Sequence, residues 1–267
     1  MTTADLAADP TAGTRLRFAV QDALVLAGRN LRHTTRQPEL LFFTTVQPVL
    51  FVLLFRYVFG GAIRTGEISY VNYLMAGIFV QTTAFSSTST GVGLAEDLSK
   101  GIIDRLRSLP ISRSAVLAGR TLGDLVRMVG VVLIMAAVGL VVGLRPASWY
   151  GFVAAIGLTA LFGFAFSWIS AWIGLAVKDV ETANVAGFVW LFPLTFASSA
   201  FVPLESMPGW LQAFARHTPV TPTCDAVRAL LNDGLPLQRP LLISLAWVVG
   251  ITAVFSVLSV RRYREVT

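Results

Sequence analysis

The sequence predicts an all-α integral membrane protein with six transmembrane helices. Hydrophobic residues make up 55% of the 267 residues, charged residues only 13%, and the mean hydropathy is +0.69. A soluble domain of this size would expose much of that apolar surface to water, whereas a bilayer is an apolar solvent. A helix needs about 20 mostly apolar residues to cross the hydrocarbon core. Such stretches lie at 40–60, 71–94, 122–144, 149–177, 184–203 and 240–260.

The six stretches are not equally apolar. The third, fourth and sixth are the most apolar, as in "VVLIMAAVGLVVG" of the third. The first and fifth each contain a proline, Pro48 and Pro193, and the second is rich in Ser and Thr. Such residues are tolerated in a span when neighbouring helices satisfy the backbone groups that they free. We therefore expect these three spans to pack against protein as well as lipid.

The N-terminal segments are expected to stay outside the bilayer. Residues 1–14 are polar and terminal, which predicts disorder, and they lack the apolar core of a cleavable signal peptide. Within residues 15–37, apolar positions recur at helical spacing with arginines mostly on other faces. This pattern predicts an amphipathic helix in the cytoplasmic membrane interface. The helix is either a plain surface anchor or also the border of a cytoplasmic partner.

The basic residues predict the orientation, because Lys and Arg next to spans are retained in the cytoplasm. When both termini are placed there, most of the 21 Lys and Arg residues fall on the cytoplasmic side, including those of the basic tail 261–267. The same bias accounts for the net charge of +6 without a nucleic-acid surface. We expect a multi-pass protein of the cell (plasma) membrane with both termini cytoplasmic and no nucleic-acid partner.

Two arginines lie within predicted spans. Arg56 and Arg127 are each near a span end, so we expect both side chains to extend to the lipid headgroups. Asp124 and Arg127 are spaced i, i+3 and are placed to pair on one helical face. A role for any of these three residues in a substrate or proton path is the alternative. No predicted span contains the series of Asp, Glu or His residues that a proton-coupled carrier would need.

The segment 203–235, between the fifth and sixth spans, is predicted to be external. It is too polar to cross the membrane and too apolar to remain in water, which predicts two short helices half-buried in the outer leaflet. Pro219 and Pro222 would break the chain between them. The single cysteine, Cys224, cannot form an intrachain disulfide and is expected to be inert. His217 is expected to be an interfacial polar residue, since no second metal ligand has suitable spacing.

A strongly charged segment, "EDLSKGIIDRLRSLPISR" at 96–113, separates the second and third spans. Its apolar residues recur at helical spacing from Ile102 to Leu109, and Pro110 ends this short helix because it lacks a backbone donor. Acidic residues alternate with basic ones, which suits a protein groove better than an anionic lipid surface. The segment is therefore predicted to dock on another protein in the cytoplasm.

The sequence lacks the common catalytic and ATP-binding motifs. The sequence contains no G-x-x-x-x-G-K-[ST] phosphate loop, no G-x-S-x-G, no H-E-x-x-H and no cysteine pair. We expect a protein that is not itself an enzyme and has no cofactor or metal in this chain. Energy for any work must then come from a partner or from a gradient.

The run "EDLSKGIIDRLRSLPISRSAVLAGRTLGDL" at 96–125 closely resembles the signature loop of ABC type 2 exporter permeases, and among them the daunorubicin-resistance-type drug and lipid exporters. The resemblance extends to "RQPELLFFTTVQPVLFVLLFRYVFGG" at 36–61, to "ASSAFVPLESMPGWLQAFARHTPVTP" at 197–222 and to the tail "RRYRE" at 261–265. In that family the loop is a coupling helix that docks on a separate ATPase subunit. The matching positions imply the docking residues Glu96, Gly101, Ile102, Ile103, Asp104, Arg105, Leu106, Arg107, Leu109 and Pro110.

The resemblance implies an ATP-driven permease subunit that exports a hydrophobic or amphipathic drug, antibiotic or lipid by alternating access. Two ABC ATP-binding subunits would bind the ATP and Mg, and a second permease chain would complete a homodimer or a heterodimer. A gradient-driven carrier or channel without an ATPase is the alternative, and a membrane-embedded enzyme is a third. We expect the substrate path to be lined by Gln47, Phe51, Gln81, Thr82, Phe85, Ser86, Phe196 and Ser198. For each of these residues, packing between spans is the alternative explanation.

Overall fold

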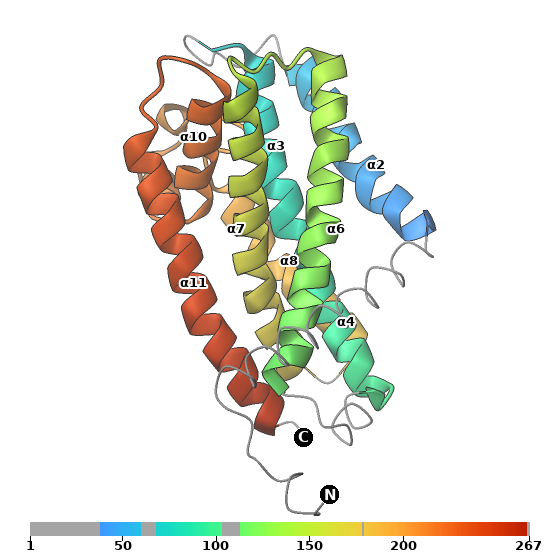
Figure 1. Cartoon of the computed structure of the whole chain (residues 1–267). Helices are drawn as coiled ribbons and strands as arrows, with labels where there is room; N and C mark the ends of the chain where they lie inside the picture. The colour runs from blue at the N-terminus through green and yellow to red at the C-terminus, as the bar shows by residue number, and fades with distance from the viewer. Residues whose placement is uncertain (1–37, 60–67, 103–112, 178, 266–267) are drawn as a thin grey trace, which may run out of the picture.

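The computed structural model describes residues 38–59, 68–102, 113–177 and 179–265, and in these ranges it is built from helices without strands (Figure 1). The predicted disordered segment 1–14 and interfacial helix 15–37 lie outside the described residues. The elements are α2 (Pro38–Leu54), the π-helix η1 (Phe55–Phe59), α3 (Tyr70–Ser86), α4 (Thr88–Ser99), α6 (Arg113–Val142), α7 (Trp149–Ala176), α8 (Val180–Phe196), the 3-10 turn η2 (Leu204–Ser206), α9 (Gly209–Arg216), α10 (Val220–Leu231) and α11 (Gln238–Glu265).

Three helices are long and apolar enough to cross a membrane. They lie in α6, α7 and α11 and match the positions of the third, fourth and sixth predicted spans. The helix α7 coincides with its predicted range, whereas α6 begins well before residue 122 and α11 continues through the basic residues 261–264. The first and fifth predicted spans correspond to shorter apolar helices, Val46–Val58 and Val180–Phe196.

The second predicted span is divided, because α3 and α4 meet at Ser87 instead of forming one helix over 71–94. Hydroxyls around the break donate to the carbonyl three residues earlier: Ser87 Oγ to Ala84 O at 2.6 Å and Thr88 Oγ1 to Phe85 O at 2.7 Å. Such side-chain bonds compete with the helical ladder and bend it. The Ser and Thr residues of this stretch therefore mark a break in the helix.

The fifth predicted span ends early. The helix α8 stops at Phe196, and residues 197–203 form a turn where the sequence predicted helix up to 203. Pro193 lies in the last turn of α8. Its ring removes one backbone donor and clashes with the preceding turn, which favours the end of the helix at this point. We call residues 197–203 the α8–η2 turn.

Local signals fix several helix ends. Ser69 and Ser148 each accept a hydrogen bond from the amide three residues later, at 3.2 and 3.0 Å, and so cap α3 and α7. Asp179 caps α8 by accepting from the Thr182 amide at 2.7 Å and from its hydroxyl at 2.8 Å, and these bonds lower the pKa of Asp179. After α6, Gly143 adopts a left-handed φ of 112°, which is typical of a helix C-terminus.

The helix α7 is the centre of the bundle, with α3, α4, α6, α10 and α11 packed around it (Figure 1). Two glycines allow α4 to approach α7 closely. A Cβ on Gly174 would lie 2.2 Å from the Gly91 carbonyl oxygen, and a Cβ on Gly91 would lie 2.3 Å from the Ser170 carbonyl oxygen. Small residues at membrane helix contacts let the backbones pack against each other. This contact fixes α4, and with it one end of the charged segment.

The two ends of the bundle carry different elements. The end of α4, the start of α6 and the C-terminal end of α11 lie at one end, and α10 lies toward the other (Figure 1). The ends of α4 and α6 that border the charged segment therefore lie on the same side of the bundle as the end of α11. The predicted topology requires them to share a side, and that this side is cytoplasmic stays a prediction.

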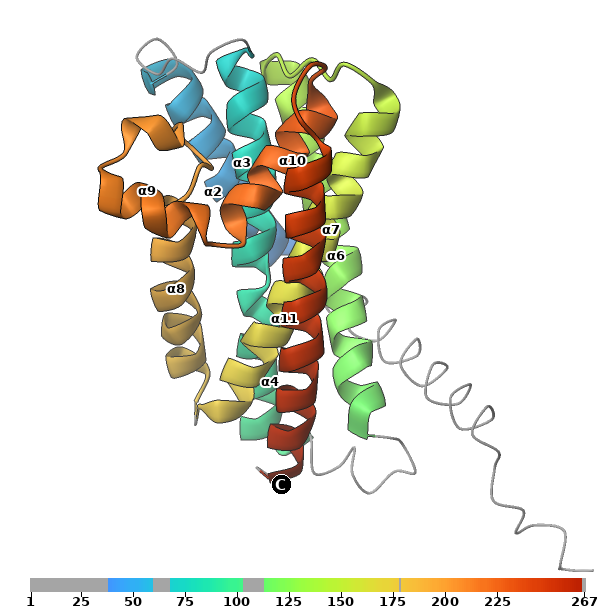
Figure 2. The same ribbon diagram turned by 90° about the vertical axis from the view of Figure 1, so that its left-hand side faces the viewer.

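The structure corrects the prediction for the external segment. Instead of lying half-buried in the outer leaflet, α10 packs against α3, α7 and α11 (Figure 2). Its residues Cys224 and Val227 are completely buried. Pro222 lies in the first turn of α10 and does not break it, because the first turn needs no intrahelical donor there. Within residues 203–235, all of which the structure describes, large exposed apolar residues occur in α9 alone: Trp210 and Phe214.

We predict that Gly174→Ala destabilises the protein, because the added methyl group meets the backbone of α4. Overpacking of this kind costs roughly 1–3 kcal/mol. The matched control is Gly157→Ala in the same helix, where a Cβ has nothing within 4 Å. Thermal unfolding in detergent should show a lower melting temperature for Gly174→Ala and an unchanged or higher one for Gly157→Ala. Equal melting temperatures would contradict the close packing of α4 on α7.

Candidate coupling site

The structure describes the two ends of the predicted coupling segment. Glu96 belongs to α4, Gly101 belongs to the turn that follows it, and Ile102 is the next described residue. The remaining predicted docking residues lie outside the described residues: Ile103, Asp104, Arg105, Leu106, Arg107, Leu109 and Pro110. The helices α4 and α6 flank this segment, and the structure describes the contacts that join them.

The chain leaves α4 through a charged last turn and a glycine. Lys100 Nζ lies 2.5 Å from Glu96 Oε1, and this exposed hydrogen bond and the charge of Glu96 raise the pKa of Lys100. Gly101 follows with φ +64°, and its amide donates to the Leu98 carbonyl at 3.1 Å. A left-handed residue that ends a helix is usually glycine, since a Cβ is strained there. This geometry gives a local reason for glycine at one predicted docking position.

An ion pair joins α4 to α6 beside this turn. Arg120 Nη1 donates to Asp97 Oδ2, and both side chains are mostly buried. A Cβ on Gly93 would lie 1.6 Å from Arg120 Nη2, so glycine at this position leaves room for the guanidinium. No sequence pattern indicates the pair of Asp97 and Arg120, because the two residues are 23 positions apart and lie on different helices.

A second group of polar contacts lies one turn further along α6. Thr90 Oγ1 donates to Asp124 Oδ2 at 2.6 Å, and Arg127 Nε lies 3.5 Å from Asp124 Oδ1. The predicted pairing of Asp124 with Arg127 is therefore confirmed. Arg127 Nη2 also donates to the Ser86 carbonyl at 2.8 Å and to Ser89 Oγ.

The expectation that Arg127 extends to the headgroups is wrong. Its side chain is only 8% exposed and reaches across the break between α3 and α4. The physical reason is that the apolar surroundings of the bundle offer no water to the polar groups at the break, and the guanidinium supplies donors to them. Arg56, the other arginine predicted within a span, is half-buried in η1.

These contacts form what we call the α4–α6 ion network: Ser86, Ser89, Thr90, Asp97, Arg120, Asp124 and Arg127. Charge-assisted hydrogen bonds are stronger than neutral ones, and removing one partner leaves the other charge desolvated and unpaired. The network therefore favours movement of α4 and α6 as one unit. Both ends of the predicted coupling segment are attached to that unit.

The structure brings together two of the predicted substrate-path residues. The ring centroids of Phe51 in α2 and Phe196 in α8 are 6.3 Å apart. Both rings also contact Phe201 of the α8–η2 turn, with centroid distances of 6.3 and 5.2 Å. Phe55 stacks on Phe201 at 4.7 Å. We call Phe51, Phe55, Phe196 and Phe201 the aromatic cluster.

The aromatic residue Phe85 and the amides of the predicted path lie apart from the aromatic cluster in the described contacts. Phe85 packs on Phe188 of α8 with ring centroids 5.4 Å apart. Gln81 is buried in α3, while Gln47 is exposed on α2. In the part of the chain that the structure describes, the ring of Phe85 packs on Phe188 and on no ring of the aromatic cluster, so the predicted positions do not gather at one site.

The predicted hydroxyl donors have mostly local roles. Ser198 Oγ donates to the Thr195 carbonyl at 2.5 Å and accepts from the Ala200 amide at 3.2 Å, which stabilises the α8–η2 turn. Ser86 contributes its carbonyl oxygen to the ion network. Of the predicted donors Thr82, Ser86 and Ser198, all within the described residues, Thr82 alone has a hydroxyl that is buried without a hydrogen-bond partner. Packing explains Ser198 and Ser86 better than substrate contact does.

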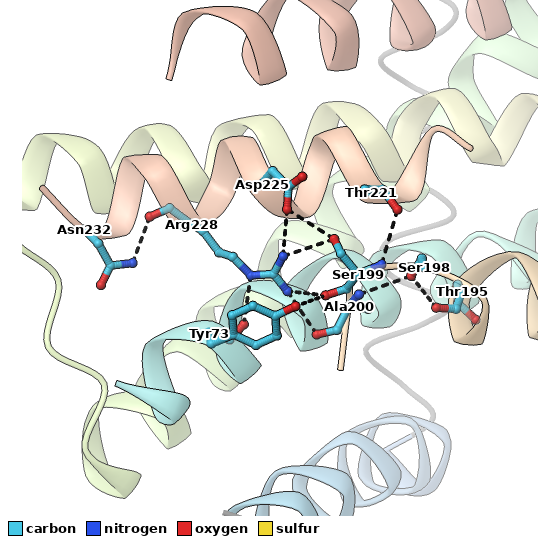
Figure 3. Close-up of polar contacts among 9 residues, drawn as sticks. All are labelled: Tyr73, Thr195, Ser198, Ser199, Ala200, Thr221, Asp225, Arg228 and Asn232. Atoms are coloured by element: carbon cyan, nitrogen blue, oxygen red, sulfur yellow. Dashed lines mark hydrogen bonds and ion pairs between the residues drawn. The ribbon is translucent and has the colours of Figure 1, made fainter. Parts of the chain in front are cut away.

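One charged residue with many contacts was not singled out by the sequence analysis. Arg228 of α10 is 4% exposed and bonds to Asp225, to the α8–η2 turn and to Tyr73 of α3 (Figure 3). The i, i+3 spacing of Asp225 and Arg228 within an otherwise apolar helix was the one available signal, and it indicates a pair but not its partners.

The family comparison covers most of the chain. A family model described as ABC-2 type transporter matches residues 21–232. The chain is 35% identical over 229 residues to the daunorubicin resistance ABC transporter permease protein DrrB1 of Streptomyces coeruleorubidus, covering 85% of this chain and 81% of that protein. It is 26% identical over 269 residues to a Mycobacterium tuberculosis protein named "Probable doxorubicin resistance ABC transporter permease protein DrrC", covering 96% and 93%.

The matched region contains the α4–α6 ion network, the aromatic cluster and Arg228. Three helices of the chain have the length and composition of membrane spans. The family match and these helices together identify an integral membrane protein and a permease component of an ABC transporter. The chain belongs to the ABC-2 type transporter family.

Proposed function

We propose that this chain is the membrane permease subunit of an ATP-driven exporter, energised by a separate ATPase subunit that docks on residues 96–113. The observation that carries the proposal is the α4–α6 ion network. It joins both ends of the segment that resembles the family's signature loop, so a force applied to that segment reaches the bundle. A freely moving loop would absorb the same force.

The proposed substrate is a hydrophobic or amphipathic molecule such as a drug, an antibiotic or a lipid. Two relatives have names that refer to daunorubicin and doxorubicin resistance. The aromatic cluster supports this substrate class, because stacked rings favour flat apolar molecules over ions. Molecules of this kind would enter from the cytoplasm or the inner leaflet and leave on the outer side.

The proposed complex contains two ATP-binding subunits and two permease chains in the plasma membrane, with both permease termini cytoplasmic. The simplest second permease is another copy of this chain. The helix α8 corresponds to the fifth predicted span, and the resemblance implies that this span lines the dimer interface. Exposed apolar residues on one side of α8 support such a contact: Val185, Phe188, Val189 and Phe192. ATP and Mg would be bound by the ATPase subunits, and this chain would hold no cofactor.

The proposed mechanism is alternating access. Closure of the ATPase dimer moves the docked segment, and α4 and α6 follow together because the ion network joins them. Since α4 also packs on α7 through Gly91 and Gly174, the movement changes the contacts at the centre of the bundle. The first, second and fifth spans then rearrange and expose the substrate to the outside.

Replacing Asp104 and Arg105 together by Ala should weaken the complex with the ATPase subunit. A loss of about 1.4 kcal/mol of docking energy lowers the affinity about tenfold, and ATP-dependent export should fall with it. Co-purification of the ATPase and uptake of daunorubicin into inverted vesicles measure the two effects. The control is Arg262→Ala with Glu265→Ala, which removes an exposed ion pair at the same end of the bundle. An intact complex with unchanged export, or export without ATP, would contradict the docking assignment.

Reversing one charge of the Asp97–Arg120 pair should uncouple ATP hydrolysis from export. Asp97→Arg and Arg120→Asp each place like charges together in a mostly buried site, which costs several kcal/mol. Export per ATP hydrolysed should fall in each single variant and recover in the double variant, where the pair is restored with opposite polarity. The comparison is valid only when the two single variants and the double variant assemble equally with the ATPase subunit, and co-purification measures this assembly. If the correctly assembled double variant is as defective as the singles, the pair does not act as a link.

A further inference from the structure

The α8–η2 turn lies directly on α3. A Cβ on Gly77 would be 1.9 Å from the Ala200 carbonyl oxygen, so the two backbones are in contact at this point. Tyr73, one turn earlier in α3, donates from its hydroxyl to the Ser199 carbonyl at 2.8 Å. The turn is thus placed on α3 by backbone contact and by a side-chain hydrogen bond.

Arg228 of α10 holds the same turn from the other side (Figure 3). Its Nη2 donates to the Ser199 carbonyl and to the Ala200 carbonyl, the second at 3.2 Å. Its Nη1 donates to Ser199 Oγ at 3.1 Å and to Asp225 Oδ1 at 2.8 Å. Its Nε donates to the Tyr73 carbonyl at 3.4 Å, and the guanidinium carbon lies 3.5 Å from the centroid of the Tyr73 ring.

This geometry requires an arginine. The guanidinium has five donors in a rigid plane, and here they reach a carboxylate, a hydroxyl and three carbonyls on three parts of the chain. A lysine has one nitrogen and cannot reach all of these acceptors at once. Asp225 is the one carboxylate among these partners of Arg228, and its side chain is 41% exposed. Most of the buried contacts of the Arg228 cation therefore come from backbone carbonyls and from the ring of Tyr73.

Packing alone does not account for a cation at this position. Neighbouring positions of α10 are already completely buried apolar residues, among them Cys224, Val227 and Leu231. Replacing a buried ionic group by an apolar one of similar volume is often neutral or stabilising. A charged residue deep in a membrane protein is therefore a candidate for a functional role, and here its partners indicate which segment it acts on.

The turn that Arg228 holds completes the aromatic cluster. Phe201 follows Ala200 directly, and its ring contacts Phe55 of η1, Phe196 of α8 and Phe51 of α2. The position of the Ala200 carbonyl therefore sets where the Phe201 ring meets the first span. Because the Ala200 carbonyl belongs to the peptide bond that joins Ala200 to Phe201, its contact with Arg228 helps to fix the position of the Phe201 ring in the aromatic cluster.

We propose that Arg228 is a positioning residue for export. It holds the α8–η2 turn so that Phe201 closes the aromatic cluster, and the exported molecule passes when this turn moves. The proposal rests on the proposed export function. It adds a residue that controls closure of the substrate path on the outer side. It assigns no substrate contact to Arg228 itself, which acts through the backbone of Ser199 and Ala200.

The test compares Arg228→Met, which keeps the length and apolar volume of the side chain, with Arg228→Lys. The matched control is Arg216→Met on the neighbouring helix α9, where the arginine is exposed. ATP-driven uptake of daunorubicin into inverted vesicles should fall more than about tenfold in Arg228→Met, because a buried charged donor is lost. Arg228→Lys should recover part of that uptake, and Arg216→Met should match the unmodified chain. Melting temperatures should be lower in the two Arg228 variants, which leave buried carbonyls unpaired, and unchanged in Arg216→Met, so uptake is compared at a temperature at which all four proteins are folded.

The single cysteine provides a second readout that needs no ATPase and no substrate. Cys224 is completely buried in α10, between Thr221, whose Oγ1 accepts from the Ser199 amide at 3.2 Å, and Arg228. Release of the turn exposes this face of α10. The rate at which a membrane-permeant maleimide modifies Cys224 should therefore rise about tenfold or more in Arg228→Met, as expected for a local opening, and stay unchanged in Arg216→Met.

Gly77→Ala displaces the same turn without altering Arg228, because its methyl group meets the Ala200 carbonyl. It should reproduce both the lower export and the faster modification, and it replaces Arg228→Met if that variant does not fold. Wild-type export in either folded variant, or unchanged Cys224 modification in both, overturns the proposal. If the unmodified chain does not export with ATP, the proposed function fails, while the Cys224 rates still decide whether Arg228 holds the turn.

Discussion

Backbone carbonyls that are freed inside an apolar bundle must find donors, and in this chain two arginines supply them. The break between α3 and α4 exposes the Ser86 carbonyl, which accepts from Arg127 of α6. The α8–η2 turn exposes the carbonyls of Ser199 and Ala200, which accept from Arg228 of α10. An unpaired polar group in such surroundings costs several kcal/mol. The irregular segments of the bundle are therefore fixed by these cations.

Each arginine makes an irregular segment depend on a helix that is distant in the sequence. Arg127 is itself oriented by Asp124, which also accepts from Thr90, so the break between α3 and α4 forms one unit with α6. Arg228 is oriented by Asp225 and by the ring of Tyr73. In the proposed alternating-access mechanism, bonding and release of these two arginine contacts would distinguish the two states.

The sequence predicted the parts of the fold that depend on length and apolar content. The helix α7 was located almost to the residue, because a run long enough to cross the hydrocarbon core begins directly after a capping serine, Ser148. The break at Ser87 was missed because Ser and Thr residues are compatible with both a packed helix and a bent one. Arg228 was missed because its partners are mostly backbone carbonyls, which leave no pattern in the sequence. The burial of α10 was missed because its apolar face fits an interface helix equally well.

The two arginine sites lie toward opposite ends of α3, which makes this helix the connection between them. Residues Tyr70 to Ala84 of α3 are buried without interruption, so the helix has little freedom to bend between its ends. Arg127 bonds to Ser86 in α3 and to Ser89 in α4, so a displacement of α4 is not absorbed at the break. In the proposed mechanism the displacement would move α3 instead, and α3 carries Tyr73 and Gly77 against the α8–η2 turn. A push on the segment after α4 would then change the contacts that hold Phe201 toward the other end of the bundle.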